Sequence, residues 1–279
     1  MILVAGGTGR LGSLLVARLA QRGLDVRVLT RDAQRARHLE GIATDITVGD
    51  VRDRASVERA VHGVDLVVSA VHGFAGPGRV TPVSVDERGN ATLVDAAVAV
   101  GADVVLMSVV GASADSPLEL FRAKYAAERH LRASPIGWTI VRASAFVELW
   151  AQIMARPIVF GRGDNPINFV AVADVADVAE AAVMDPSRRG QIIEVGGPEN
   201  LTFNELAALM QDIRGDHAKV RHVPRWLLGL TAPFVRPTRA ALAMDTMDLS
   251  YSPPGHPDGD LTDVRTALSR ALRPMQPHP

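Results

Sequence analysis

Met1-Ile-Leu-Val-Ala-Gly-Gly-Thr-Gly-Arg-Leu-Gly12 is the stretch that decides the fold. An apolar run leads into Gly6, Gly9 and Gly12, and an amphipathic run follows as far as Gln21. A strand, a glycine-rich turn and a helix in this order predict a dinucleotide site. Gly6 permits a tight turn, Gly9 lets the backbone approach a pyrophosphate, and Gly12 allows the helix to pack closely on the strand. We expect the phosphates at the helix N-terminus, where backbone N–H groups attract anions.

The rest of the first half repeats the alternation of strand and helix. Glycines at this spacing also occur in plain structural turns, but a second β-rich segment at 26–30 closes a βαβ unit within about thirty residues, which favours the dinucleotide site. Strands are expected at 1–5, 26–30, 46–48, 66–70, 104–108 and 138–141, and helices at 12–21, 33–40, 55–62, 88–100 and 118–133. Nearly continuous apolar strands are typical of buried parallel sheets. The pattern predicts an α/β fold, a doubly wound parallel Rossmann sheet of about seven strands.

The second half has a different rhythm. A Gly-, Pro- and Arg-rich loop excursion is expected near 151–166, followed by a strand at 167–172, a helix at 175–184 and a strand at 192–195. Thr202 and Glu205 have capping-box spacing, so a further helix should begin there. We therefore expect a Rossmann domain over 1–198 and a small, mainly helical substrate-covering region over 199–279.

Three C-terminal segments have less specific patterns. The apolar stretch Trp226–Val235 fits core packing or a lid, and also a dimer face or a membrane contact. Segment 252–259 is rich in turn residues, and 273–279 contains three prolines and is expected to fray. The role of residues 220–279 does not follow from their sequence.

Composition limits the function classes. The chain has 279 residues, 47% of them hydrophobic, and a net charge of −1, which gives no general drive toward nucleic acid. It has no cysteine, so disulfides and thiolate metal sites are excluded, and its eight histidines lack metal-ligand spacing. No apolar run is long enough for a membrane span, and a strand beginning at Met1 leaves no room for a signal peptide. A cytoplasmic protein is expected.

The end of the second strand distinguishes NAD from NADP. An acidic residue about twenty positions after the glycines would bind ribose hydroxyls, whereas an arginine accommodates the 2′-phosphate. Arg31 stands at that point, one residue before Asp32, and Arg10 lies in the glycine turn. A guanidinium pairs with phosphate in bidentate fashion. The sequence favours NADP(H) over NAD(H), although Arg31-Asp32 is also compatible with a plain solvated turn.

Further candidates follow the third and fourth strands. Asp50 could accept a hydrogen bond from the adenine amine, and it could also cap the next helix. His72 is a candidate substrate-side group at the carboxyl edge of the sheet, where ligands bind in open α/β folds, unless it is merely exposed. The complete set of expected cofactor contacts is Gly6, Thr8, Gly9, Arg10, Leu11, Gly12, Arg31, Asp50, Val51, Ala70, Val71, Ser108 and Lys124.

Several motifs together carry a family resemblance. They are Gly6–Gly12, Thr30-Arg-Asp32, Gly49-Asp50, Gly89-Asn90, Leu93-Val-Asp-Ala-Ala97, Ser108 with Gly111, Lys124-x-x-x-Glu128 with Leu131, Thr139-Ile-Val-Arg142 and Asp174-Val-Ala176. Over about residues 1–200 the chain resembles the NmrA-like group of atypical short-chain dehydrogenases/reductases. The resemblance implies a Rossmann domain that binds NADP(H), with a variable C-terminal part over the substrate.

One departure from the superfamily concerns proton transfer. Typical members use Tyr-x-x-x-Lys, in which the tyrosine transfers the proton and the lysine binds the nicotinamide ribose. Lys124 matches the lysine, but Leu120 replaces the tyrosine and cannot donate a proton. Ser108 matches the serine near the substrate carbonyl. Lys124 could instead form a surface ion pair with Glu128 one turn later, but it is one of only two lysines in an arginine-rich chain, which favours a specific role.

These features predict an NADPH-dependent oxidoreductase that acts on a small carbonyl, quinone or enone compound without the usual tyrosine. Ser108, Lys124 and His72 are the candidate catalytic residues. A quinone suits the missing tyrosine, because solvent can supply the proton. The alternative is a non-catalytic NADP(H)-binding sensor or assembly protein, and a sugar-nucleotide epimerase ranks third. The expected partner is a small-molecule substrate, and a homodimer is possible.

Overall fold

The computed structural model describes residues 1–73, 80–216, 218–252 and 261–272. Its contacts divide the chain into two compact units that interleave in sequence. Unit 1 comprises Met1–Arg142 and Val175–Glu194, and unit 2 comprises Ala143–Asp174 and the chain from Val195 onward. The expected division at residue 198 differs from this one, because 143–174 groups with the C-terminal region rather than with the Rossmann domain.

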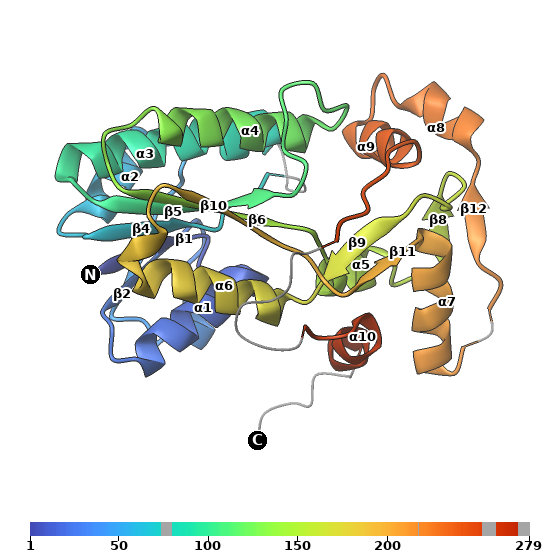
Figure 1. The fold of residues 1–279 in the computed structure, drawn as a ribbon, viewed down its shortest axis with the longest axis horizontal. Helices are drawn as coiled ribbons and strands as arrows, with labels where there is room; N and C mark the ends of the chain where they lie inside the picture. The colour runs from blue at the N-terminus through green and yellow to red at the C-terminus, as the bar shows by residue number, and fades with distance from the viewer. Residues whose placement is uncertain (74–79, 217, 253–260, 273–279) are drawn as a thin grey trace. The chain divides into compact units, whose positions relative to one another are not determined.

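Unit 1 is built on a seven-stranded sheet in the order β10-β6-β5-β4-β1-β2-β3 (Figure 1). The strands are β1 (Ile2–Ala5), β2 (Val26–Thr30), β3 (Asp45–Val48), β4 (Leu66–Ser69), β5 (Asp103–Val109), β6 (Trp138–Ala143) and β10 (Gln191–Val195). The neighbouring pairs from β3 through β2, β1 and β4 to β5 are parallel. The predicted Rossmann sheet is confirmed. Its strand order reverses between β1 and β4, and a doubly wound sheet binds ligands at that point.

Helices cover both faces of this sheet (Figure 1). They are α1 (Arg10–Gln21), α2 (Arg54–Val61), α3 (Arg88–Val100), α4 (Glu119–Arg132) and α6 (Val172–Met184), with a π-helical turn at Val83–Glu87 directly before α3. On α1 the buried residues Leu11, Leu15 and Leu19 recur every four positions, which places them on one face. The helix expected at 33–40 is a short 3₁₀ segment, Gln34–Leu39.

Unit 2 has shorter strands than unit 1, and they form two small sheets. It contains β7 (Ala145–Phe146), α5 (Val147–Ile153), β8 (Ile158–Phe160), β9 (Ile167–Val170), β11 (Glu199–Leu201), α7 (Phe203–Arg214), β12 (Arg221–Val223), α8 (Arg225–Thr231), α9 (Arg236–Met244) and α10 (Val264–Leu272). Its strands form the sheets β11-β9-β7 and β12-β8. The excursion expected as a loop near 151–166 therefore includes the end of α5 and the whole of β8, which pairs with β12 from much later in the chain.

Other expectations for unit 2 have mixed outcomes. The capping box is confirmed, since Glu205 N–H donates to Thr202 Oγ1 at 3.1 Å and Thr202 N–H donates to a Glu205 carboxylate oxygen at 2.7 Å. The strand expected over 167–172 ends at Val170.

Almost all of 252–259, and all of 273–279, lie outside the described residues. Within the described ranges, no helix combines the length and apolar character that crossing a membrane requires.

Candidate cofactor and active site

The glycine turn after β1 has no room for side chains at two of its positions. Gly6 has φ +83°, and a Cβ there would lie 2.7 Å from the carbonyl oxygen of Ala70 at the end of β4. A Cβ on Gly12 would collide with the carbonyl oxygen of Gly6. A Cβ on Gly9 would meet only Gly6 O, at 3.2 Å. The tight turn and the close helix packing expected at Gly6 and Gly12 are thus present.

The N-terminus of α1 is suited to an anion. Gly9 is its N-cap, no side chain caps it, and its first turn contains no acidic residue. Two hydrogen bonds to carbonyls of the turn stabilise it: Gly9 N–H donates to Gly6 O at 2.9 Å, and Ser13 Oγ donates to Gly7 O at 3.0 Å. Thr8, Arg10 and Leu11 belong to this same turn. A cradle that excludes Cβ atoms, beside an uncapped helix N-terminus, fits a pyrophosphate.

The end of β2 carries an exposed arginine followed by an aspartate that accepts a backbone hydrogen bond. Arg31 is exposed. Asp32 accepts a hydrogen bond from Gln34 N–H at 2.8 Å, so its carboxylate is engaged in a turn with its own backbone. Thr8 and Thr30 hydroxyls lie 3.3 Å apart and connect this strand end to the glycine turn.

Asp50 follows β3 and is held by Arg52. Arg52 Nη2 lies 2.6 Å from Asp50 Oδ2, and Arg52 N–H donates to Asp50 Oδ1 at 2.9 Å. The hydrogen bond from the Arg52 side chain lowers the pKa of Asp50, and the charge of Arg31 lowers it further. Asp53, rather than Asp50, caps α2 through Ala55 N–H. Val51 is buried and packs against Gly89 on α3.

The residues after β4 reach the same edge of the sheet. Ala70 N–H donates to Ala5 O at 2.9 Å, and Val71 comes next. His72 is exposed, although protein atoms around it limit its hydration. This desolvation lowers the pKa of His72, and the charges of Lys124 and Arg31 lower it further while the charge of Asp86 opposes them.

Lys124 on α4 is buried beneath this edge, with 4% of its surface exposed. Its Nζ donates to Val71 O at 3.0 Å and to Met107 O at 2.9 Å, and it lies 3.0 Å from Asp86 Oδ1. Asp86, from the π-helical turn, is fully buried and also accepts from Gly73 N–H at 2.7 Å. The surface pair with Glu128 that was the alternative for Lys124 is not what the structure contains.

Ser108 at the end of β5 belongs to a second buried network. Its hydroxyl donates to Glu128 Oε1, and Glu128 is fully buried. Arg142 on β6 binds both oxygens of that carboxylate, at 2.9 Å through Nε and 2.6 Å through Nη2, and contacts Glu194 at 3.1 Å. The Glu128 carboxylate raises the pKa of Arg142. The network joins β5, α4, β6 and β10 behind the sheet edge.

A model of a family described as NAD(P)H-binding matches residues 6–186, which include every candidate cofactor residue. The chain belongs to the NAD(P)H-binding family. This confirms the expected nicotinamide cofactor and the predicted resemblance to atypical short-chain dehydrogenases/reductases.

Several proteins similar to this chain are reductases. An NAD(P)H azoreductase from Xenophilus azovorans is 29% identical over 98% of this chain and 94% of its own length. A (4-alkanoyl-5-oxo-2,5-dihydrofuran-3-yl)methyl phosphate reductase from Streptomyces griseus is 32% identical over 77% of this chain and 74% of its own. An Escherichia coli NADPH-dependent quinone oxidoreductase, solved with NADPH, superposes with a TM-score of 0.76 at 19% identity, covering 97% of this chain and 99% of that one. The last comparison supports the fold alone.

In this member of the NAD(P)H-binding family, Leu120 lies one helical turn before Lys124 on α4 and is half-buried. Asp86 and Arg142 were not among the predicted site residues. Asp86 has no sequence signal beyond its place three residues before Gly89-Asn90, and only folding brings it against Lys124. Within the described residues, no group of three His, Asp or Glu side chains is arranged to hold a metal.

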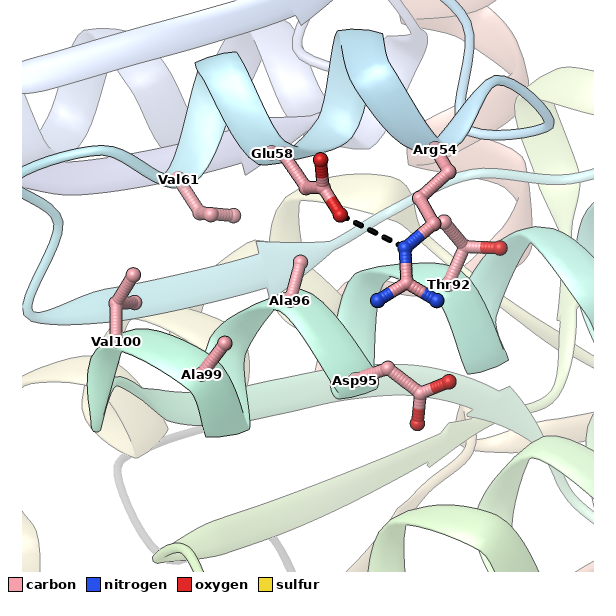
Figure 2. A pocket seen from close by; sticks show the side chains of 8 residues that line it. All are labelled: Arg54, Glu58, Val61, Thr92, Asp95, Ala96, Ala99 and Val100. Atoms are coloured by element: carbon pink, nitrogen blue, oxygen red, sulfur yellow. Dashed lines mark hydrogen bonds and ion pairs between the residues drawn. The ribbon is translucent and has the colours of Figure 1, made fainter.

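A pocket of about 110 Å³ lies between α2 and α3 and is separate from these residues (Figure 2). Its lining consists of Arg54, Glu58, Val61, Thr92, Asp95, Ala96, Ala99 and Val100. Arg54 and Glu58 form an ion pair at 2.7 Å, and Asp95 lies 2.7 Å from His130 Nε2, so each charged group of the lining has a partner. None of the predicted cofactor contacts lines this pocket of the NAD(P)H-binding protein.

Proposed function

We propose that this protein is an NADPH-dependent reductase of small quinone-type acceptors, including the azo compounds and enones that accept a hydride in the same way. The observation that carries the proposal is the residue four positions before the buried Lys124 on α4. It is Leu120, which cannot donate a proton, in place of the tyrosine of the superfamily pattern. A quinone suits this site, because its reduced anion is a weak base that water can protonate. The similarity to an azoreductase along nearly the whole chain supports the same class.

The preference for NADPH rests on the end of β2. The Asp32 carboxylate is engaged with Gln34 N–H at 2.8 Å, whereas Arg31 is exposed and its charge acts on Asp50. A ribose 2′-phosphate would therefore meet a guanidinium, and ribose hydroxyls would lack their usual carboxylate partner.

The chain's own residues would bind the cofactor and orient it. The Gly6–Gly12 turn and the N-terminus of α1 would hold the pyrophosphate, and Asp50 and Val51 would flank the adenine. Lys124 positions the carbonyls of Val71 and Met107 at the sheet edge and lies near the expected ribose. When bound, the reduced nicotinamide supplies the hydride.

The proton would come from solvent. His72 is an exposed titratable group at this edge. Its pKa is lowered from the ordinary value, which favours the neutral ring, so it would act as a polar contact rather than as the acid. Ser108 would act through Glu128, because its hydroxyl already donates to that carboxylate.

The test is a comparison of acceptors. NADPH oxidation should be measured with benzoquinones, naphthoquinones and an azo dye, and with aliphatic aldehydes of similar size as the control. We expect turnover with the quinones and none above background with the aldehydes, whose alkoxide product requires a stronger acid. Turnover of aldehydes at comparable rates would contradict the proposal.

A second candidate function is a non-catalytic NADP(H)-binding sensor or assembly protein. One observation favours it: Ser108 and Lys124, the retained polar residues, are both buried and have protein partners. Tight NADPH binding without turnover of any acceptor in the panel would select this function.

A further inference from the structure

The helical hairpin α8–α9 exposes large apolar side chains. Trp226 is 67% exposed, Leu230 is 65% exposed and Phe234 is 88% exposed. Leu227 and Val235 are exposed beside them, and these five residues are here called the α8–α9 surface. Single exposed apolar residues are normal, but a run of five within ten positions is a mark of an interaction site.

The exposure has a local cause. Leu228 is almost completely buried and Ala232 is buried, so one side of α8 packs inward, and α8 and α9 contact each other. A surface helix normally carries polar residues on its other side. Here that side carries Trp226 and Leu230, so α8 is apolar on both faces and one face has no partner among the described residues.

The segment of sequence that carries this surface contains cations and no carboxylates. Between Asp216 and Asp245 the sequence contains no carboxylate, but it contains five cations, in a chain whose net charge is −1. They are Lys219, Arg221, Arg225, Arg236 and Arg239, and all are exposed. Arg225 and Arg236 directly flank the apolar run at either end. Arg225 lies 3.1 Å from Asp245, and Arg239 donates to the carbonyls of Ala232 and Pro233, so part of the positive charge also braces the hairpin.

We propose that the α8–α9 surface docks this protein on an anionic lipid surface. Tryptophan, leucine and phenylalanine with flanking arginines are the composition of segments that lie in the plane of a membrane interface, where rings enter the boundary region and guanidinium groups meet phosphates. A second copy of the chain is disfavoured, because a two-fold interface over this surface would bring together the arginines that flank it in both copies, Arg225 and Arg236. The inference is independent of the reductase activity.

The test is co-sedimentation of the full chain with vesicles, without nucleotide or acceptor. Vesicles of phosphatidylcholine are compared with vesicles of phosphatidylcholine mixed with phosphatidylglycerol, at low and high salt. We expect binding to the anionic vesicles, weaker binding to the neutral ones, and a decrease with salt. A blue shift of tryptophan emission should accompany binding and disappear in Trp226→Ser.

Variants separate the two contributions. Leu230→Ser with Phe234→Ser should weaken partitioning about tenfold or more. Arg221→Gln with Arg236→Gln should weaken it roughly 25-fold at low salt, about fivefold for each cation. The matched controls are Val100→Ser, 44% exposed on α3, and Arg54→Gln with Arg132→Gln, which should bind like the parent.

Three outcomes would overturn the proposal. One is equal or absent binding to the two kinds of vesicle. Another is loss of a dimer in the Leu230→Ser/Phe234→Ser variant without any vesicle binding by the parent, which would make the surface a contact between copies. The last is a raised KM in that variant, again without vesicle binding by the parent, which would make the hairpin a substrate lid.

Discussion

Lys124 Nζ lies 3.0 Å from Asp86 Oδ1, and both side chains are buried. The pair joins α4 to the π-helical turn before α3. The same ammonium donates to the carbonyl of Val71, which follows β4, and to that of Met107 within β5. π-helical turns are frequent at functional sites. Here the turn supplies the carboxylate that makes a buried lysine tolerable at the edge where the cofactor is expected.

Asp86→Asn should lower the free energy of unfolding by about 3–5 kcal/mol, because it leaves the Lys124 charge buried without its counter-ion. Denaturant unfolding measures the change. Asp95→Asn on the exposed surface of α3 is the control and should cost less than about 1 kcal/mol. Replacing both partners, as Asp86→Leu with Lys124→Met, should cost less than the sum of the single replacements. Additive costs would show that the two charges do not interact.

Arg31→Asp should weaken NADPH binding by about 10- to 100-fold, because a charged hydrogen bond contributes about 1.5–3 kcal/mol. NADH affinity should change little or improve. Titration of both nucleotides by nicotinamide fluorescence measures this, and Arg54→Asp on α2 is the control. Equal affinity of the parent for the two nucleotides would contradict the assignment of Arg31 to the 2′-phosphate.

Gly12→Ala should abolish nucleotide binding and destabilise the protein, because the added Cβ collides with the carbonyl oxygen of Gly6. Gly229→Ala is the matched control, since a Cβ there meets nothing within 4 Å. It lies inside α8 and should stabilise the protein by up to about 1 kcal/mol. Thermal unfolding and NADPH titration of the Gly12→Ala and Gly229→Ala variants measure the two effects. Normal binding by Gly12→Ala would show that the turn can open.

The free energy of unfolding should rise with pH toward about 6.5, the ordinary pKa of histidine. The pKa of His72 is lowered in the folded protein, mainly by desolvation, so below that pH the unfolded chain takes up a proton that the folded protein does not bind. His72→Gln should flatten this part of the profile. Unfolding measured from pH 5 to 7 tests it, and identical slopes in parent and variant would exclude His72 as the source.

Local pattern was sufficient for much of the Rossmann half. The glycine turn, the positions of strands β1 to β6 and the capping box at Thr202 depend on residues close in sequence, so they could be predicted, although the bounds of β6 and several other strands differ by one or two residues. The β8–β12 pairing and the interleaved units could not, because they join segments about sixty residues apart and short strands carry little pattern of their own.

The sequence by itself determined that this chain binds a nicotinamide dinucleotide and that it lacks a tyrosine before Lys124, because both depend on which residue stands at a fixed spacing on one turn or one helix. Only the tertiary structure decided what Lys124 and Ser108 contact. Both side chains are buried, and burying a charge or a hydroxyl costs free energy unless it has a partner. Folding supplies these partners, Asp86 for Lys124 and Glu128 for Ser108, from distant parts of the sequence.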